Sequence, residues 1–403
     1  MLAANYQDYM FGLLKKVIDE IGPRPSCSEA EKRLGRLLVE EWRPFCDKVD
    51  VEPFTCSPTA AFGSLYLIVL FYLATIILYW FFPPLALVIA AVNCGIVFLE
   101  TLRIREVVDF LFSKKQGENV VGVIQPQNQA SQRVVVSAHI DSAYESTLSY
   151  YLKDLSVLVE FAAMLGLVMS LGASLAKTLA YFNVFSGEGA LTGVGIALIA
   201  LLPLAGLVLL MTSNKPVPGA MDNMSGGSVV SGLGKYLAEA RKSGDWYPER
   251  TEVVLLGTSS EEAGLRGAKR YAKRHLAELR AIRTCVLNLD GICDEKFLTI
   301  IKREIFNGAE YDPRLVKMAQ EVAASHDWPI TVLSYPIPGG SDGSAFALRG
   351  IPTVFLSAAD YSRVPFNYHT RNDTYEHIRP ESLSVMLQLV VEMIQRIDRG
   401  ESM

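Results

Sequence analysis

Four long hydrophobic runs, grouped in two pairs, interrupt this chain of 403 residues and restrict the folds available to it. The runs cover residues 62–82, 85–102, 155–176 and 190–211. A helix of about 20 apolar residues crosses the roughly 30 Å of hydrocarbon in a bilayer, so each run is long enough, or nearly so, to span it. Buried core helices are the alternative, but the runs come in pairs and contain few polar residues. The pattern predicts two transmembrane helical hairpins, residues 58–114 and 147–213.

The rest of the chain, residues 1–57, 115–146 and 214–403, is expected to form one discontinuous α/β domain. In its second half, strand-like runs alternate with helical stretches, and this alternation predicts a mixed β-sheet with helices on both faces. The predicted strands cover residues 48–54, 119–125, 133–139, 251–257, 284–290, 297–301, 330–333 and 352–357.

A short polar loop, residues 126–132, joins the second and third predicted strands. A loop of this length predicts that the two strands pair as an antiparallel hairpin. The second strand should then begin at the edge of the sheet where the third one ends. Both hydrophobic pairs would leave the domain from that edge.

Acidic and histidine side chains follow the ends of several predicted strands. His139 ends one strand, and Asp141 comes two residues later, where it can hold the imidazole ring of His139. Asp222 lies in a glycine-rich loop before a helical stretch, where a carboxylate can bridge two cations or cap the helix. In open α/β sheets, binding sites form at the edge where the parallel strands end.

Four more candidates occupy similar positions. Glu261 and Glu262 follow a buried strand as adjacent carboxylates, and their side chains should point in different directions, so that one can bind a metal while the other transfers protons. A solvated acidic helix start is the alternative. Asp290 ends another apolar strand, and His369 lies in a loop of turn-forming residues. Together with the histidine and aspartate candidates above, these residues predict the ligand set and base of a two-metal hydrolase.

The order of these motifs resembles metallopeptidase family 28, the co-catalytic di-zinc exopeptidases typified by leucyl aminopeptidases and glutamate carboxypeptidases. The shared motifs are His-x-Asp, Asp-Asn-x-Ser-Gly, Glu-Glu-x-Gly-Leu-x-Gly, Asn-Leu-Asp, Ser-Asp and Tyr-His-Thr, and they span the soluble parts of the chain nearly end to end. The segment Ile-Gly-Pro-Arg-Pro-Ser at residues 21–26 is similar to the family's opening segment. Ser28 and Glu31, just after it, independently have the spacing of a helix capping box.

The resemblance implies the zinc exopeptidase fold and two zinc ions bridged by Asp222. His139 and Asp290 would complete the ligands of one ion. Glu262 and His369 would complete those of the other. Nitrogen and oxygen ligands of this kind suit zinc, and two neighbouring metals can acidify a shared water and stabilise an oxyanion.

The same resemblance makes Glu261 the general base, which takes a proton from water and returns it to the leaving amine. Asp141 is counted with it as catalytic because it can orient His139. One departure is visible: Gly343 follows the Ser-Asp motif, where many relatives have a histidine. The loop at residues 338–343 is expected to line the substrate pocket, so the resemblance does not define the substrate preference.

The leading hypothesis is therefore a membrane-anchored aminopeptidase that removes the N-terminal residue from peptides, including membrane-associated ones. A second hypothesis is an acyltransferase similar to glutaminyl cyclases, which use a similar fold with a single zinc. A third is a catalytically inactive receptor or scaffold of the same fold. Relatives of that kind lose ligands or the base, whereas all six positions are filled here.

The charge and the cysteine content of the chain indicate its binding partners, its disulfide content and its orientation in the membrane. A net charge of −5 without a basic stripe gives no support for nucleic-acid binding, so the expected partners are a peptide and the lipid bilayer. Six cysteines without a CxxC pair make a disulfide framework unexpected. Lysine and arginine cluster on the domain side of the hairpins, with only Lys177 in the far loops. The positive-inside rule then places the catalytic domain and both termini in the cytoplasm.

Overall fold

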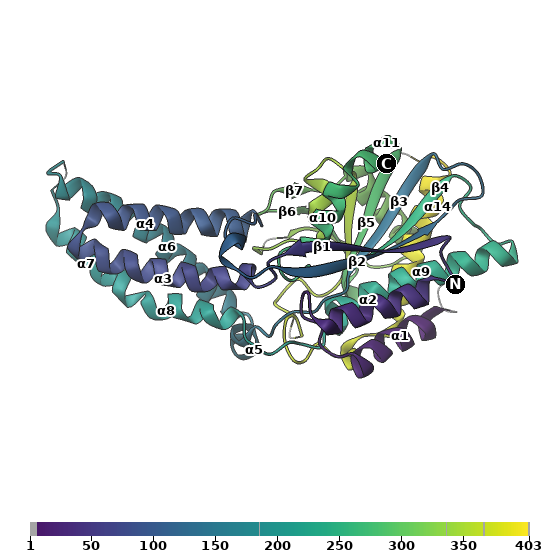
Figure 1. The fold of residues 1–403 in the computed structure, drawn as a ribbon, viewed down its shortest axis with the longest axis horizontal. Coiled ribbons are helices and arrows are strands. Elements are labelled where there is room, and N and C mark those ends of the chain that lie inside the picture. Colours follow the sequence, from purple (N-terminus) through teal and green to yellow (C-terminus); the bar gives the residue numbers. More distant parts are fainter. Residues whose placement is uncertain (1–5, 185, 336, 366, 402–403) are drawn as a thin grey trace. The chain divides into compact units, whose positions relative to one another are not determined.

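The computed structural model describes residues 6–401 except residues 185, 336 and 366 (Figure 1). It divides into two compact units. The first consists of Met1–Pro58, Lys114–Tyr144 and Pro216–Met403, and it contains the β-sheet. The second consists of Thr59–Ser113 and Glu145–Lys215, and it is helical.

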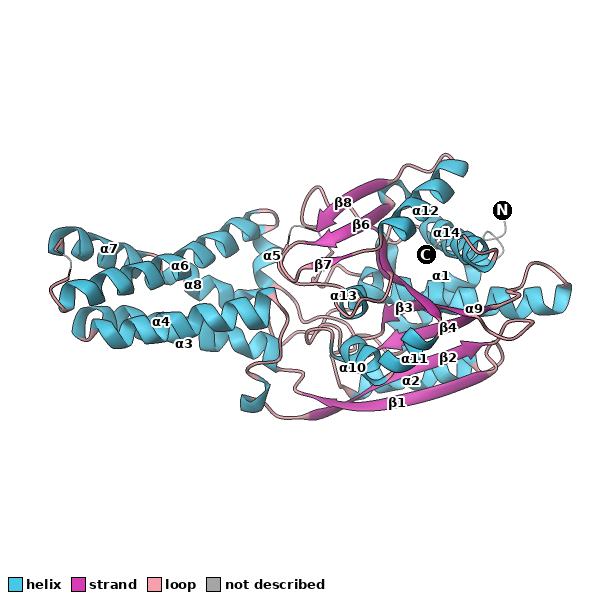
Figure 2. Ribbon diagram, turned by 90° about the horizontal axis from the view of Figure 1, so that it is seen from above, coloured by secondary structure: helices cyan, strands magenta, loops and turns pink. Residues whose placement is uncertain are grey.

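The first unit is built on one nine-stranded mixed sheet, seen from above in Figure 2. The strand order is β1-β2-β4-β3-β5-β9-β6-β7, and β8 pairs with β6. The central strands β4, β3, β5 and β9 are mutually parallel, whereas β1, β2 and β7 pair antiparallel with their neighbours. The strands are β1 (Lys48–Cys56), β2 (Lys115–Ile124), β3 (Gln132–His139), β4 (Thr251–Thr258), β5 (Arg283–Ile292), β6 (Thr299–Glu304), β7 (Ala309–Glu310), β8 (Thr331–Tyr335) and β9 (Thr353–Ala358).

Helices cover both faces of this sheet, because the central strands are apolar on both sides. Val134 and Val136 of β3 belong to a core with helices α1, α2, α9, α12 and α14, whereas Val135 belongs to a second core with α10, α11 and α13. The predicted mixed sheet with helices on both faces is confirmed. The helices are α1 (Gln7–Glu20), α2 (Glu29–Trp42), α9 (Ser225–Ser243), α10 (Arg266–Arg274), α11 (Leu276–Ala281), α12 (Pro313–Ser325), α13 (Asp342–Ala347) and α14 (Pro380–Asp398).

The predicted hairpin of β2 and β3 is wrong, because β4 lies between these strands. All eight residues of β4 are buried, so β4 needs a neighbour on each side. The connection from Ile124 to Gln132 is long enough to cross two strand spacings, roughly 10 Å. The expected direction is correct, since β2 is antiparallel to β4 and β3 is parallel to it. Val120 pairs with Gly257 and His139 with Thr258, so β2 starts at the edge where β3 ends.

The second unit contains four helical segments long and apolar enough to cross a membrane: Ala60–Phe81, Pro83–Leu102, Leu155–Tyr181 and Glu188–Met211. The second ends in a π-helical turn, and the fourth is divided at Leu201 because Pro203 starts a new helix there. The helical elements are α3 (Ala60–Phe81), α4 (Pro83–Ile96), η2 (Val97–Leu102), η3 (Asp109–Leu111), α5 (Thr147–Leu152), α6 (Leu155–Tyr181), α7 (Glu188–Ala200), α8 (Leu202–Leu207) and η4 (Val208–Met211).

These helices are apolar on their outer as well as their inner faces. Leu70, Phe161 and Ile196 are more than half exposed. Inside the bundle, the buried hydroxyl groups of Tyr72 and Tyr79 donate to backbone carbonyls of α7, at 3.1 and 2.6 Å. Helices that are hydrophobic all round are typical of a membrane domain.

Candidate metal centre

The structure brings all five predicted ligands together at one edge of the sheet. Parallel strands deliver three of them, because their carboxyl ends meet at the same edge. The other two come from loops beside that edge. The five are His139 at the end of β3, Glu262 after β4, Asp290 in β5, Asp222 in the kinked turn η5 (Ala220–Met224) before α9, and His369 after β9.

Asp222 lies between two groups of donor atoms. Its Oδ1 is 2.9 Å from Nε2 of His139, and its Oδ2 is 3.1 Å from Nε2 of His369. Nε2 of His139 is 3.8 Å from Oδ1 of Asp290, and Nε2 of His369 is 3.2 Å from Oε2 of Glu262. The ligand atoms of each resulting triad lie within 4.8 Å of one another. The two oxygens of one carboxylate therefore face two separate sets of donors.

The chemistry of this cluster fits bound cations. Asp222, Glu262 and Asp290 are mostly buried, and their described ion pairs are with the two histidines. Within the described part of the chain, Oε1 of Glu262 is buried without a hydrogen-bond partner. Buried carboxylates are costly unless they are paired or bind a metal, and imidazole with carboxylate is a ligand set that zinc accepts. The residues present fit a zinc site.

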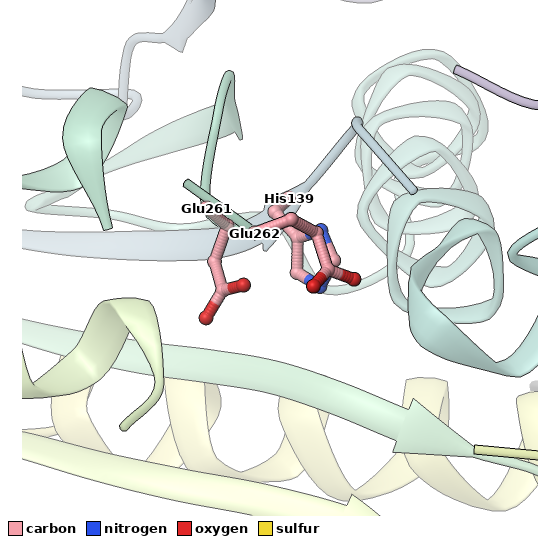
Figure 3. A group of neighbouring side chains, drawn as sticks. All are labelled: His139, Glu261 and Glu262. Carbon is pink, nitrogen blue, oxygen red and sulfur yellow. The ribbon is translucent and has the colours of Figure 1, made fainter. Parts of the chain in front are cut away.

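Glu261 and Glu262 leave the backbone in different directions, as Figure 3 shows beside His139. Burial raises the pKa of Glu261 well above its ordinary value, against the opposing charge of His139 and with the support of Glu262 and Asp342. A carboxylate with a raised pKa can take up a proton and return it. One oxygen of Glu261 also lies within 4.8 Å of donor atoms of His139 and Glu262, so Glu261 is close enough to be a ligand itself.

The carboxylate of Asp141 contacts the His139 ring and also the backbone of Glu261 and Glu262. Its Oδ1 is 3.3 Å from Nδ1 of His139, the contact that the strand alternation predicts. The same carboxylate accepts the backbone N–H of Glu261 at 3.0 Å and of Glu262 at 3.1 Å. Ser26 donates its hydroxyl to Oδ2 at 2.6 Å. Asp141 therefore fixes one imidazole and two glutamate backbones at once, while its part in catalysis stays a prediction.

The loop that was expected to line the pocket is anchored by buried acids. Glu304 accepts the backbone N–H of Ser341 at 3.0 Å and its hydroxyl at 2.7 Å. Asp342 accepts the hydroxyl of Thr258 at the end of β4. A Cβ atom at Gly343 would lie 3.2 Å from the Tyr311 ring, so this position packs against Tyr311. The loop's contact with substrate stays a prediction.

Two buried charged residues at the site were not assigned a role from the sequence. Arg24 binds backbone carbonyls beside Asp222, and Asp373 accepts backbone amides of the same turn. Arg24 lies in the segment at residues 21–26, between two prolines, and Asp373 follows His369 by four residues. Their spacing relative to Asp222 gives no local signal, because the contacts form only in the folded chain.

Comparison with protein families gives a match over most of the second half of the chain. Residues 209–394 match the model of peptidase family M28. This matched segment is a little less than half of the chain. It contains Asp222, Glu262, Asp290 and His369, whereas His139 precedes it, on the other side of the second hydrophobic pair. A comparison of the sequence with curated proteins gave no match.

Solved structures of a glutaminyl cyclase and of aminopeptidases share the fold. A glutaminyl cyclase from an Acidobacteriales bacterium superposes with a TM-score of 0.57 at 14% identity, covering 98% of this chain and 94% of the cyclase. The zinc aminopeptidase BSAP from Bacillus subtilis gives 0.56 at 14% identity, covering 97% and 95%. An aminopeptidase from Aneurinibacillus sp. strain AM-1 gives 0.55 at 13% identity, covering 97% and 93%. These likenesses confirm the predicted zinc exopeptidase fold.

Proposed function

We propose that this protein is a membrane-anchored di-zinc aminopeptidase that hydrolyses the N-terminal peptide bond of peptides. The observation that carries the proposal is the position of Asp222, whose two oxygens each face a separate imidazole and carboxylate. One ion would be held by Asp222 with His139 and Asp290. The other would be held by Asp222 with Glu262 and His369.

Bound zinc would supply Lewis acidity, which lowers the pKa of a coordinated water and polarises a peptide carbonyl. The protein's own side chains transfer the protons and position the reacting groups. Glu261 takes the proton from the attacking water and passes it to the leaving amine. Asp141 keeps the His139 ring and the backbones of both glutamates in place, so that base and ligands hold a fixed relation during turnover.

A reaction like that of glutaminyl cyclases is the second candidate, because such an enzyme shares the fold over nearly the whole chain. Two complete donor sets favour two metals over one and therefore favour the peptidase. A scaffold without activity is the third candidate. The presence of Glu261 and of all five ligands within one cluster argues against it, since a scaffold needs neither.

Metal stoichiometry and product analysis distinguish these functions. The purified full-length protein in detergent should bind two zinc ions and release free N-terminal residues from a peptide library. Peptides blocked at the amino terminus should resist cleavage, whereas peptides blocked at the carboxyl terminus should be cleaved. One zinc per chain together with pyroglutamate products would support the cyclase instead. Cleavage that requires a free carboxyl terminus would contradict the aminopeptidase.

We also propose that membrane-associated peptides are among the substrates and that the catalytic unit faces the cytoplasm. β1 ends at Cys56, which pairs with Lys115 at the start of β2, and β3 ends at the same edge of the sheet. The chain therefore leaves the catalytic unit toward both hydrophobic pairs from the edge that carries the ligands. Efficiency on apolar membrane-bound peptides, compared with soluble peptides of the same terminal residue in liposomes, tests this preference. Equal efficiency would contradict it.

A further inference from the structure

The turn that carries Asp222 is bound on one side by Arg24, whose guanidinium is fully buried. Nη1 of Arg24 donates to the carbonyl oxygen of Pro218 at 2.8 Å, and Nη2 donates to that of Gly219 at 2.9 Å. Nε donates to the carbonyl oxygen of Ile140 at 3.1 Å. Burial lowers the pKa of Arg24 to about 10, which leaves it a cation at neutral pH. Arg24 therefore connects the turn with the end of β3.

The backbone conformation at Gly219 allows the turn to approach the Arg24 guanidinium closely. Its φ of +69° lies in the left-handed region, which favours glycine. A Cβ atom there would lie 2.5 Å from Cβ of Ser142 and 3.0 Å from Nη2 of Arg24. No side chain fits between the turn and the guanidinium, so the carbonyl groups approach Arg24 directly.

Asp373 binds the same turn from the other side, and its side chain is also fully buried. Its Oδ1 accepts the backbone N–H of Met221 at 2.7 Å, and its Oδ2 accepts that of Asp222 at 3.1 Å. The backbone carbonyl of Asp373 accepts the N–H of Ala220 at 3.2 Å. Asp373 lies in the loop of His369, so it joins two of the ligand-bearing segments.

We infer that Arg24 and Asp373 are positioning residues, which together fix the carboxylate of Asp222 by binding the carbonyl and amide groups of its turn. The guanidinium cation of Arg24 binds the carbonyls through charge-assisted bonds, which are the stronger ones, and the two carboxyl oxygens of Asp373 accept the amides. The inference rests on the proposed two-zinc function. Because Asp222 offers one oxygen to each donor set, a loosened turn should weaken both metals in parallel.

The variant Asp373→Asn tests this inference, with Asp398→Asn as a matched control. Asp398 is also buried and also accepts two consecutive backbone amides, those of Glu249 and Arg250, at 2.9 and 3.0 Å. Asp398 ends α14, and its carboxylate contacts Thr251 at the start of β4, whereas the proposed ligands lie near the end of that strand. The control therefore removes the same kind of bond at the opposite edge of the sheet.

Zinc affinity of the full-length protein is measured by competition with a chromophoric chelator. Asp373→Asn should lower the affinity at both sites by about 10- to 100-fold, the effect typical of residues that orient ligands. Asp398→Asn should leave both affinities unchanged even where it lowers the thermal midpoint. Arg24→Lys keeps the charge but not the planar fork, and it should weaken both sites in the same way.

Wild-type affinity at both sites in Asp373→Asn, or an equal loss in Asp398→Asn, would overturn the inference. Loss at one site alone would also overturn it, since the shared carboxylate predicts a parallel change. Should the wild-type chain bind no zinc, the proposed function fails, and hydrogen exchange of the Met221 and Asp222 amides then decides separately. Faster exchange of these amides in Asp373→Asn than in Asp398→Asn supports the positioning role, and equal exchange refutes it.

Discussion

Replacing Glu261 by glutamine should separate proton transfer from metal binding. Glutamine has nearly the same shape as glutamate, and the backbone N–H of residue 261 stays bound to Asp141, so the loop should keep its position. A positioned general base contributes about 10²- to 10⁴-fold to the rate. We therefore expect turnover to fall by at least about 100-fold, which corresponds to about 2.7 kcal/mol in the activation free energy. Two zinc ions should remain bound.

Glu262→Gln is the matched control, because it makes the same change one residue further along the chain. Glu262 contacts Nε2 of His369 through Oε2, and its other oxygen is buried without a hydrogen-bond partner among the described residues. We expect this variant to lose one zinc ion. Steady-state kinetics on a free N-terminal peptide and metal analysis of the same samples are the assays. Normal turnover in Glu261→Gln, or loss of zinc from it, would refute the assigned role, and the second result would make Glu261 a ligand.

Further predictions concern the bridging ligand, the core and the topology. Asp222→Ala should cost both zinc ions as well as activity, because it removes an oxygen from each donor set, and two tightly bound ions in this variant would exclude a bridge. Gly226→Ala should lower the unfolding free energy by about 1–3 kcal/mol in denaturant titrations, since its Cβ would lie 2.9 Å from the carbonyl oxygen of Leu289. Gly12→Ala, with open space at its Cβ, should not destabilise the protein. Reporters fused at either terminus should both behave as cytoplasmic, and activity on opposite sides of the membrane would contradict four spans.

The edge of the sheet that carries the proposed ligands could be predicted from the sequence, because several of these residues follow an apolar, strand-like run. An apolar run that ends in a histidine or an acid marks the end of a strand, as at His139 and Asp290, and parallel strands bring such ends together. The adjacent pair Glu261 and Glu262 follows the same rule. The local pattern predicts that these residues meet at one edge of the sheet, whereas their roles as ligands and base follow from the family resemblance.

The neighbours of each strand could not be predicted in the same way. β4 enters between β2 and β3 because its eight buried residues need pairing on both sides, and that requirement arises from segments far away in the sequence. The two-residue strand β7 is too short to leave a pattern. The contacts of Arg24 could not be predicted from the sequence either. Its guanidinium binds backbone carbonyls, and these are present whatever side chains the residues carry.

The second hydrophobic pair interrupts the chain between His139 and Asp222, two proposed ligands that are 83 residues apart in the sequence but whose Nε2 and Oδ1 atoms lie 2.9 Å apart. A short antiparallel pairing in the catalytic unit, called the neck, keeps the two ends of this insertion together. Tyr144 forms a β-bridge with Pro216, and the N–H of Val217 donates to the carbonyl oxygen of Ala143 at 2.9 Å. Pairing at the neck fixes the two ends of the insertion side by side, so the cost of closing the loop does not fall on the ligands. A hydrophobic helical hairpin can therefore lie within this connection while the distance between His139 and Asp222 is kept.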